Sequence, residues 1–438
     1  MDRLADMAEE LRRVAVIGCG FAGIAAALKL AERNIPVTLF EAGKVLGGRA
    51  RGVDYRGVRL DNGQHILLGA YHETLSLMDG IGVRDAVLRL PLALSVPGQF
   101  ALRAPALPAP LHLLLGLLNA QGLPFGERLS AIRFALRLRL MGFRLAQDIS
   151  VASLLARHGQ DGNIGRLLWE PLCLAALNTP MDQASAQVFL NVLRDSFSHA
   201  RSDSDMVLPR VDLSALLPDA AARHLRSRGG KILTGCRIRR IDAADQGFTL
   251  HWEGGSENFS HVVCATAPQH ALPLLSTLPE LAPAAGLIQK FSYQPIATIY
   301  LQYPEQAGLP HPMLGLSGGW AQWVFDHGRT HGIPGLLAVI ISTEGAWQHI
   351  PAEQLAARIA AELTQAFKLP EPLWHKVIVE KRATFACTVG TVRPDQKTGL
   401  RNFYLAGDYT ASDYPATLES AVRSGVKCAG LISESISN

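Results

Sequence analysis

Three glycines near the start of the chain have the spacing of a phosphate-binding loop. Gly18, Gly20 and Gly23 form a GxGxxG pattern. In this pattern the first glycine permits a tight turn, the second lets backbone N–H groups approach a pyrophosphate, and the third lets helix and strand pack closely. Glu41 follows where a carboxylate would accept from ribose hydroxyls and disfavour a 2′-phosphate. The pattern predicts a dinucleotide site, with NAD and FAD both open, at Gly18, Gly20, Phe21, Ala22, Gly23, Glu41 and Ala42.

The residues around these glycines predict the elements that such a site needs. Arg13 to Ile17 is a short apolar run, Phe21 to Arg33 is rich in Ala and Leu at helical spacing, and Pro36 to Phe40 is apolar again. Strand patterns recur far along the chain, at 231–234, 237–241, 248–252, 261–265 and 403–406. We therefore expect a nucleotide domain that is assembled from separated segments.

The rest of the sequence predicts a second domain. Residues 76–199 have a largely helical pattern, whereas 291–301 and 335–342 contain the alternation or apolar runs of strands. The expected fold is α/β, with a Rossmann-type domain and an inserted α+β substrate domain. The predicted boundaries are 1–75, 200–270 and 385–438 for the nucleotide domain, and 76–199 and 271–384 for the substrate domain.

Composition limits the classes of function. The 438 residues carry a formal net charge of +4 without a lysine-rich run or the spacing of a zinc site, so we expect no nucleic-acid partner and no metal. The six cysteines are scattered, which is typical of reduced side chains. Met1 to Arg13 is charged and mixed in sign without an apolar core, so we expect no export signal and a cytoplasmic location.

Motifs at both ends of the chain separate FAD from NAD. Leu46-Gly47-Gly48-Arg49 follows Glu41, and Leu405-Ala406-Gly407-Asp408 precedes Thr417-Leu418-Glu419-Ser420-Ala421. This combination resembles the flavin amine oxidase and phytoene desaturase superfamily. The resemblance implies a flavin amine oxidase-like fold that binds FAD. Attachment should be non-covalent, because no cysteine stands just before the late helix.

The resemblance also implies a role for each motif. A helix that begins near Leu418 would direct N–H groups at the N1–C2=O edge of the flavin, which stabilises the anion of the reduced ring. Thr417 and Leu418 would then lie under that ring. The other implied contacts are Gly47, Gly48 and Arg49 beside the pyrophosphate, Gly407 and Asp408 at the phosphate and ribityl portion, and the backbone of Ile238 at the adenine.

A more particular similarity covers nearly the whole chain. The segments RLDNGQHILLGAY at 59–71 and WEPLCLAALNT at 169–179, with the ending at 407–421, resemble the hydroxysqualene dehydroxylase family, the squalene-associated FAD-dependent desaturases. This implies reductive conversion of hydroxysqualene to squalene and water in bacterial hopanoid synthesis. The alternatives are an oxidative carotenoid or phytoene desaturase and a flavin-bearing carrier or assembly protein for polyprenyl lipids. Only one dinucleotide motif is visible, so an external system would supply the reductant.

Loss of an allylic hydroxyl needs a dry pocket and a proton donor. His65 and Asp61 are the candidates for the acid, since they follow the Gly-Gly-Arg segment closely enough to return to the flavin, and a histidine titrates in the useful range. The alternative is that both side chains only hold their loop by hydrogen bonds.

The segment 107–146 has the pattern of a membrane-contacting surface. Leu107 to Leu118 is rich in leucine but too short to span a bilayer, which needs about 20 apolar residues. Leu129, Ile132, Leu136, Leu140 and Phe143 then recur at helical spacing, and Arg133, Arg137 and Arg144 share another face. We expect peripheral contact through this segment. The alternative is a pair of core-facing helices with solvated arginines.

Overall fold

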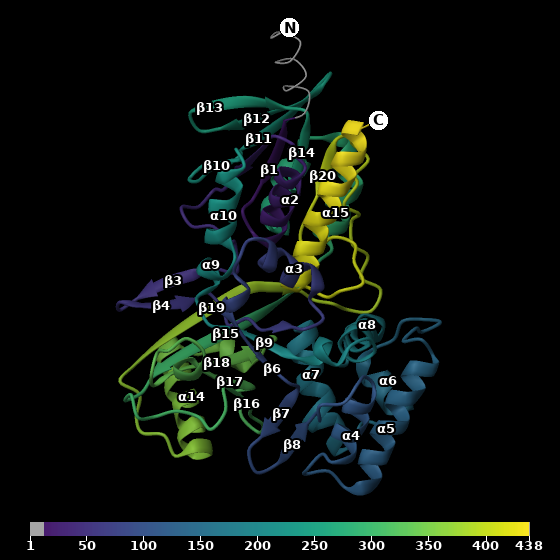
Figure 1. The fold of residues 1–438 in the computed structure, drawn as a ribbon, viewed down its shortest axis with the longest axis vertical. Helices are drawn as coiled ribbons and strands as arrows, with labels where there is room; N and C mark the ends of the chain where they lie inside the picture. Colours follow the sequence, from purple (N-terminus) through teal and green to yellow (C-terminus); the bar gives the residue numbers. More distant parts are fainter. Residues whose placement is uncertain (1–12, 438) are drawn as a thin grey trace.

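A parallel sheet carries the glycine loop (Figure 1). The computed structural model describes residues 13–437, and the stretch 1–12, within which no export signal is expected, lies outside the described residues. The five strands run in the order β10-β2-β1-β14-β20. They are β10 (Lys231–Leu233), β2 (Val37–Phe40), β1 (Val14–Ile17), β14 (His261–Cys264) and β20 (Phe403–Leu405). All but β10 are buried along their length, as continuous apolar strands in a covered parallel sheet should be.

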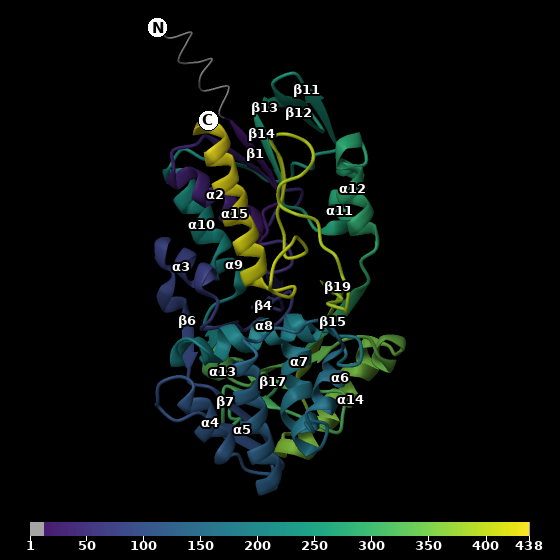
Figure 2. The ribbon, with the colours of Figure 1, turned by 90° about the vertical axis from the view of Figure 1, so that its right-hand side faces the viewer.

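Helices α2 (Phe21–Glu32) and α15 (Leu418–Ser437) lie side by side against this sheet (Figures 1 and 2). Their contact is close because Gly425 has no side chain: a Cβ there would lie 2.1 Å from the carbonyl oxygen of Ala22. Helix α10 (Pro218–Ser227) also packs on α2. The predicted strand–helix–strand unit is therefore confirmed, and so is the assembly of the sheet from three separated stretches.

A three-stranded antiparallel sheet, β11 (Arg240–Ala244), β12 (Gly247–Trp252) and β13 (Gly255–Phe259), lies at one end of the parallel sheet (Figure 1). The strand predicted at 237–241 is wrong in position, since β11 begins only at Arg240. Before it, the backbone N–H groups of Gly235 and Cys236 donate to carbonyls of the loop after β2. This part of the chain is therefore held beside Glu41 before the strand begins.

The second large sheet is antiparallel, in the order β16-β17-β18-β15-β19. Its strands are β16 (Met313–Gly315), β17 (Trp323–Asp326), β18 (Leu336–Ser342), β15 (Tyr293–Gln302) and β19 (Trp374–Phe385), and α14 (Ala352–Phe367) packs on it. The strands predicted at 291–301 and 335–342 are confirmed as β15 and β18. The edge strand β19 was not predicted, because charged residues interrupt its alternation.

Residues 76–199 form the helices α4 (Leu111–Leu118), α5 (Phe125–Leu140), α6 (Val151–Arg157), α7 (Glu170–Leu177) and α8 (Ala186–Phe197). The expectation of a largely helical stretch needs a correction, because β6 (Val87–Leu90), β7 (Ala93–Val96) and β8 (Phe100–Arg103) come first. Gly98, with φ +70°, makes the turn between β7 and β8. That Pro-Gly turn was the signal of a hairpin.

The shorter elements join the two parts. They are β3 (Gly52–Tyr55), β4 (Val58–Asp61), β5 (Leu67–Leu68), α3 (His72–Gly80), η1 (Arg84–Ala86), η2 (Gly165–Trp169), η3 (Arg201–Ser204), β9 (Met206–Pro209), α9 (Leu213–Leu216), α11 (Pro268–Leu275), η4 (Pro279–Leu281), α12 (Ala282–Gln289), α13 (His327–Thr330) and η5 (Ala346–His349). Figure 2 shows α11 and α12 beside the parallel sheet. We propose the domain boundaries predicted from the sequence with one change. The nucleotide-domain segment that begins at residue 200 ends after α12 instead of at residue 270.

Candidate functional site

At each of the three glycine positions in the loop between β1 and α2, a different steric reason favours glycine. Gly18 has φ +104°, which strongly favours glycine. A Cβ on Gly23 would lie 1.9 Å from the carbonyl oxygen of Gly18, so only glycine lets the helix approach its strand. A Cβ on Gly20 would meet no protein atom within 4 Å. The open side of Gly20, with Phe21 and Ala22 beginning α2, is therefore a place where a pyrophosphate can approach the backbone.

Glu41 stands at the mouth of this loop. Its Oε2 accepts from the backbone N–H of Cys19 at 3.0 Å, and its Oε1 accepts from Gly43 across Ala42 at 2.7 Å. These bonds hold the carboxylate at the end of β2, in the position expected for a ribose contact. The backbone N–H of Cys236 donates to Glu41 O, so the chain leading to buried Ile238 passes the same place.

The Gly-Gly-Arg segment runs along the glycine loop. The backbone N–H of Gly47 donates to Cys19 O at 2.8 Å, and a Cβ on Gly48 would lie 3.3 Å from Gly20 Cα. Arg49 then reaches the late motif, where its Nη2 lies 2.7 Å from both carboxylate oxygens of Asp408. Segments more than 350 residues apart are thereby joined by one charge-assisted contact.

The late motif positions the start of α15. The backbone N–H of Gly407 donates to Ser424 Oγ at 2.8 Å, which fixes the Gly-Asp pair to the helix. Thr417 Oγ1 accepts from the N–H of Ser420 at 3.1 Å and so caps the helix. The predicted helix start at Leu418 is confirmed. The remaining N–H groups of the first turn give this end of α15 a partial positive charge.

These features fit a dinucleotide that carries a flavin. The open side of Gly20 can take a pyrophosphate, Glu41 can hold a ribose, and the Arg49–Asp408 pair joins the Gly-Gly-Arg segment to the late motif. When bound, a flavin would supply hydride transfer. The chain itself supplies backbone donors, a carboxylate and a helix N-terminus for such a ligand.

Asp61 is the last residue of β4 and His65 lies on the segment that follows it, in different surroundings. Asp61 is 2% exposed, its Oδ1 accepts from Leu213 N at 2.7 Å, and burial raises its pKa to about 7. His65 is half-buried, and its Nδ1 lies 2.7 Å from Gly63 O, so the proton of the neutral ring is on Nδ1. Burial and the charge of Arg49 lower the pKa of His65. Near neutral pH Asp61 can therefore carry a proton to donate, whereas Nε2 of His65 accepts.

The raised pKa of Asp61 has a consequence for stability. Its ordinary value is 3.8, so between about pH 4 and about pH 7 the folded chain holds a proton that the unfolded chain releases. The stability from this proton is complete below that interval and is lost as the pH rises through it. In Asp61→Asn, the fall in unfolding free energy from about pH 5 to about pH 8 should be smaller than in wild type by roughly 2 kcal/mol. Urea unfolding at both pH values measures this difference.

The exposed Asp245→Asn change is the control, since it should leave the wild-type pH dependence unaltered. An equal fall in Asp61→Asn and wild type would mean that the Asp61 carboxyl titrates normally in the folded protein.

Three further polar residues belong to the site and were not predicted there. Arg393 donates to the carbonyls of Ser412 and of Tyr414, so it holds the loop that follows Asp408. Burial raises the pKa of Tyr293, and the charges of Arg382 and Arg49 oppose that rise. Glu419 is fully buried and bonds α15 to α3. The sequence feature that indicated a partner for Glu419 was Arg423, one helical turn later.

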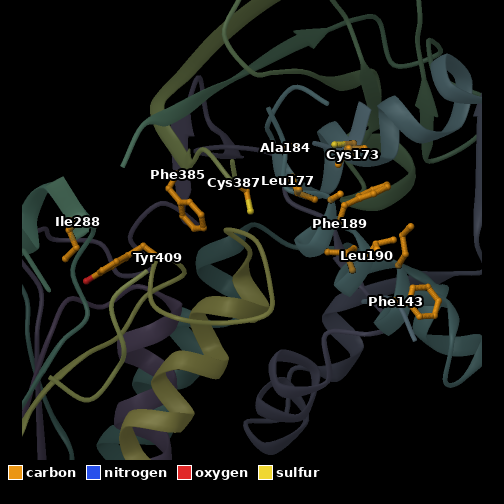
Figure 3. Close-up of a cluster of buried hydrophobic side chains, with 14 of the residues drawn as sticks. Phe143, Cys173, Leu177, Ala184, Phe189, Leu190, Ile288, Phe385, Cys387 and Tyr409 are labelled. Carbon is orange, nitrogen blue, oxygen red and sulfur yellow. The ribbon is translucent and has the colours of Figure 1, made fainter. Parts of the chain in front are cut away.

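An apolar cavity lies in the helical part of the molecule. It holds about 680 Å³ of empty space including its open mouth, and its walls come from β7, β8, α4, α5, η2, α7 and α8. Figure 3 shows the buried cluster that continues from it: Phe143 on the cavity wall, Phe189 and Leu177, then Phe385 and Tyr409, the residue after Asp408. Apolar packing therefore connects the cavity with the candidate site.

Known proteins are similar to this chain over nearly its whole length. A family model described as flavin containing amine oxidoreductase matches residues 21–433. Hydroxysqualene dehydroxylase from Rhodopseudomonas palustris is 29% identical over 96% of this chain and 98% of its own. The 15-cis-phytoene desaturase of Solanum lycopersicum is 26% identical over 96% of this chain and 77% of its own.

A solved structure confirms the fold. Cyclohexylamine oxidase from Brevibacterium oxydans superposes with a TM-score of 0.73 over 97% of this chain and 99% of that chain, at 19% identity. The predicted Rossmann-type domain with an inserted substrate domain is thus confirmed. The chain belongs to the flavin-containing amine oxidoreductase family and is a flavin-dependent oxidoreductase.

Proposed function

We propose that the chain binds FAD non-covalently and reductively converts hydroxysqualene to squalene and water, in bacterial hopanoid synthesis. The observation that supports this most directly is an apolar cavity, lined almost entirely by hydrophobic side chains, in the same molecule as a dinucleotide cradle. Colinear similarity to hydroxysqualene dehydroxylases from three organisms supports the choice of substrate. The proposed FAD contacts are the individual residues predicted from the sequence, of which Gly18 is the first and Leu418 the last.

The proposed reaction balances with one proton and one hydride. The allylic C–O bond breaks, the hydroxyl leaves as water with the added proton, and a hydride from reduced FAD forms the new C–H bond. An external reductant, a nicotinamide, a reductase or a quinone, then restores the electrons. The chain's part is to keep the reacting carbon dry and to supply the proton, and Asp61 is the candidate that holds one near neutral pH.

The test is an anaerobic half-reaction. The protein is reduced without oxygen, hydroxysqualene is added in detergent micelles, and the absorbance of oxidised flavin is followed while the lipid is extracted for mass analysis. We expect reoxidation with one squalene formed per flavin. In Asp61→Asn, reoxidation should be slower while FAD binding is retained.

Two other outcomes would replace the proposal. If the reduced protein stayed reduced and phytoene bleached the oxidised protein, the chain would be an oxidative desaturase, as its similarity to phytoene desaturases allows. If neither lipid changed the flavin, a lipid carrier would be favoured. We also propose that the protein is cytoplasmic and contacts the membrane peripherally, since its proposed substrate is an apolar lipid.

A further inference from the structure

Helix α5 has two apolar faces, and only one of them is in the core. Its buried residues are Ala131, Phe134 and Leu138. At about 100° per residue, a second stripe on the opposite side contains Phe125, Leu129, Ile132, Leu136 and Leu140, of which Ile132, at the edge of the stripe, packs partly against the core. Leu140 is 90% exposed and Phe125 63% exposed. The alternative of ordinary core-facing helices therefore does not account for this stripe.

The neighbouring helix extends the exposed apolar surface. Leu111 and Leu115, one turn apart on α4, are both exposed, and α4 packs against α5. We call the exposed side chains of Leu111, Leu115, Phe125, Leu136 and Leu140 the α4–α5 surface. They are half of the ten large exposed hydrophobic side chains among residues 13–437, gathered in 30 positions. Such a concentration of apolar side chains on a solvent-exposed face indicates an interaction site.

Arginines border this surface on both sides. On the helical wheel Arg133 and Arg137 flank the exposed stripe on one edge and Arg139 on the other, and all three are exposed. Glu127 is the one acidic residue in 107–146, and its carboxylate accepts from Ile164 N, away from the stripe. With five arginines this segment carries a net charge of +4, equal to the formal charge of the whole chain.

The cavity opens on the same surface. Its wall includes Leu113 and Leu114 of α4, and Leu136 and Arg139 of α5, of which Leu136 and Arg139 are also exposed. Figures 1 and 2 show α4 and α5 at the end of the molecule opposite the parallel sheet. No helix within residues 13–437 is long and apolar enough to cross a bilayer.

We propose that the α4–α5 surface docks on a bilayer of anionic lipids and that the cavity takes its apolar substrate directly from that bilayer. The exposed leucines and Phe125 insert at the boundary between headgroups and acyl chains, while the arginines contact lipid phosphates. The uptake of substrate rests on the proposed function. The docking itself does not.

The experiment is flotation of the flavin-loaded full chain with vesicles. Vesicles of equal parts phosphatidylcholine and phosphatidylglycerol should retain the wild type, and high salt should release it. Leu115→Ser with Leu140→Ser, neither of which lines the cavity, should weaken binding about tenfold, and Arg133→Ala with Arg137→Ala also about tenfold on anionic vesicles. Leu373→Ser, at an exposed leucine elsewhere, is the matched control and should bind as wild type.

Docking is overturned if the wild type does not float, or if the leucine variant floats equally well. It is also overturned if the leucine variant converts a dimer into a monomer, which would make this surface an interface between copies. Uptake has its own readout: the leucine variant should reoxidise with micellar hydroxysqualene at the wild-type rate, but about tenfold more slowly with substrate in vesicles. Equal rates would overturn uptake. A failure of the wild type in micelles would concern the proposed reaction alone.

Discussion

Replacing Gly20 with alanine is expected to weaken FAD binding about a hundredfold, or about 2.8 kcal/mol, and to leave the fold unchanged. The backbone of Gly20 is extended, with φ −75° and ψ 177°, which alanine adopts without strain. The added methyl group would meet no protein atom within 4 Å, so only a ligand on that side can collide with it. Titration of the deflavinated protein with FAD measures the affinity, and its thermal unfolding measures the fold.

Substitutions at two other glycines are the controls for this result. Gly430→Ala, on α15, also adds a methyl group into open space and should bind FAD as wild type does. Gly23→Ala places its methyl group 1.9 Å from Gly18 O and should lose stability and FAD binding together. If Gly20→Ala bound FAD normally, the pyrophosphate would not approach this face of the loop.

The sequence was most informative where a structure depends on neighbouring residues. The β1–α2–β2 unit needs only a short apolar run, an alanine-rich helix and a second run in succession, and all three elements form as predicted. Strand β19 was missed because an exposed edge strand buries few of its side chains, so its charged residues conceal the pattern. The hairpin of β7 and β8 was missed because its strands are short.

The candidate site shows the same limit. The glycine pattern indicated each steric role of Gly18, Gly20 and Gly23, because each depends on the local path of the chain. The ion pair of Arg49 with Asp408 joins two motifs that were recognised separately, but their spacing along the chain says nothing about that contact. Likewise, the amphipathic pattern of α5 was visible in the sequence, whereas which apolar face enters the core depends on α4 and the cavity.

Replacing Glu419 with alanine is expected to lower the free energy of unfolding by about 3 kcal/mol. The carboxylate is fully buried, and four donors converge on it: Arg423 Nε at 2.7 Å, Thr74 Oγ1 at 2.7 Å, and the backbone N–H groups of Thr74 and Glu73. Alanine leaves these donors without an acceptor, and the two N–H groups belong to the first turn of α3. Urea unfolding of the flavin-free protein measures the loss.

Two variants separate the buried network from a general effect on α15. Glu434→Ala removes an exposed carboxylate from the same helix and should cost no more than about 0.5 kcal/mol. Glu419→Gln keeps an acceptor for two donors but turns an amide N–H toward the other two, so its stability should fall close to that of the alanine variant.

The same network should also affect the flavin, because Glu419 is the second residue of α15 and ties the helix start to α3. A looser first turn directs its N–H groups less well at a bound flavin ring, so Glu419→Ala should lower the FAD affinity even at temperatures where the variant is folded. Unaltered affinity together with lost stability would mean that the helix start is held by the Thr417 cap and the Gly407–Ser424 bond alone. Lost affinity with unaltered stability would mean that Glu419 faces the flavin rather than α3.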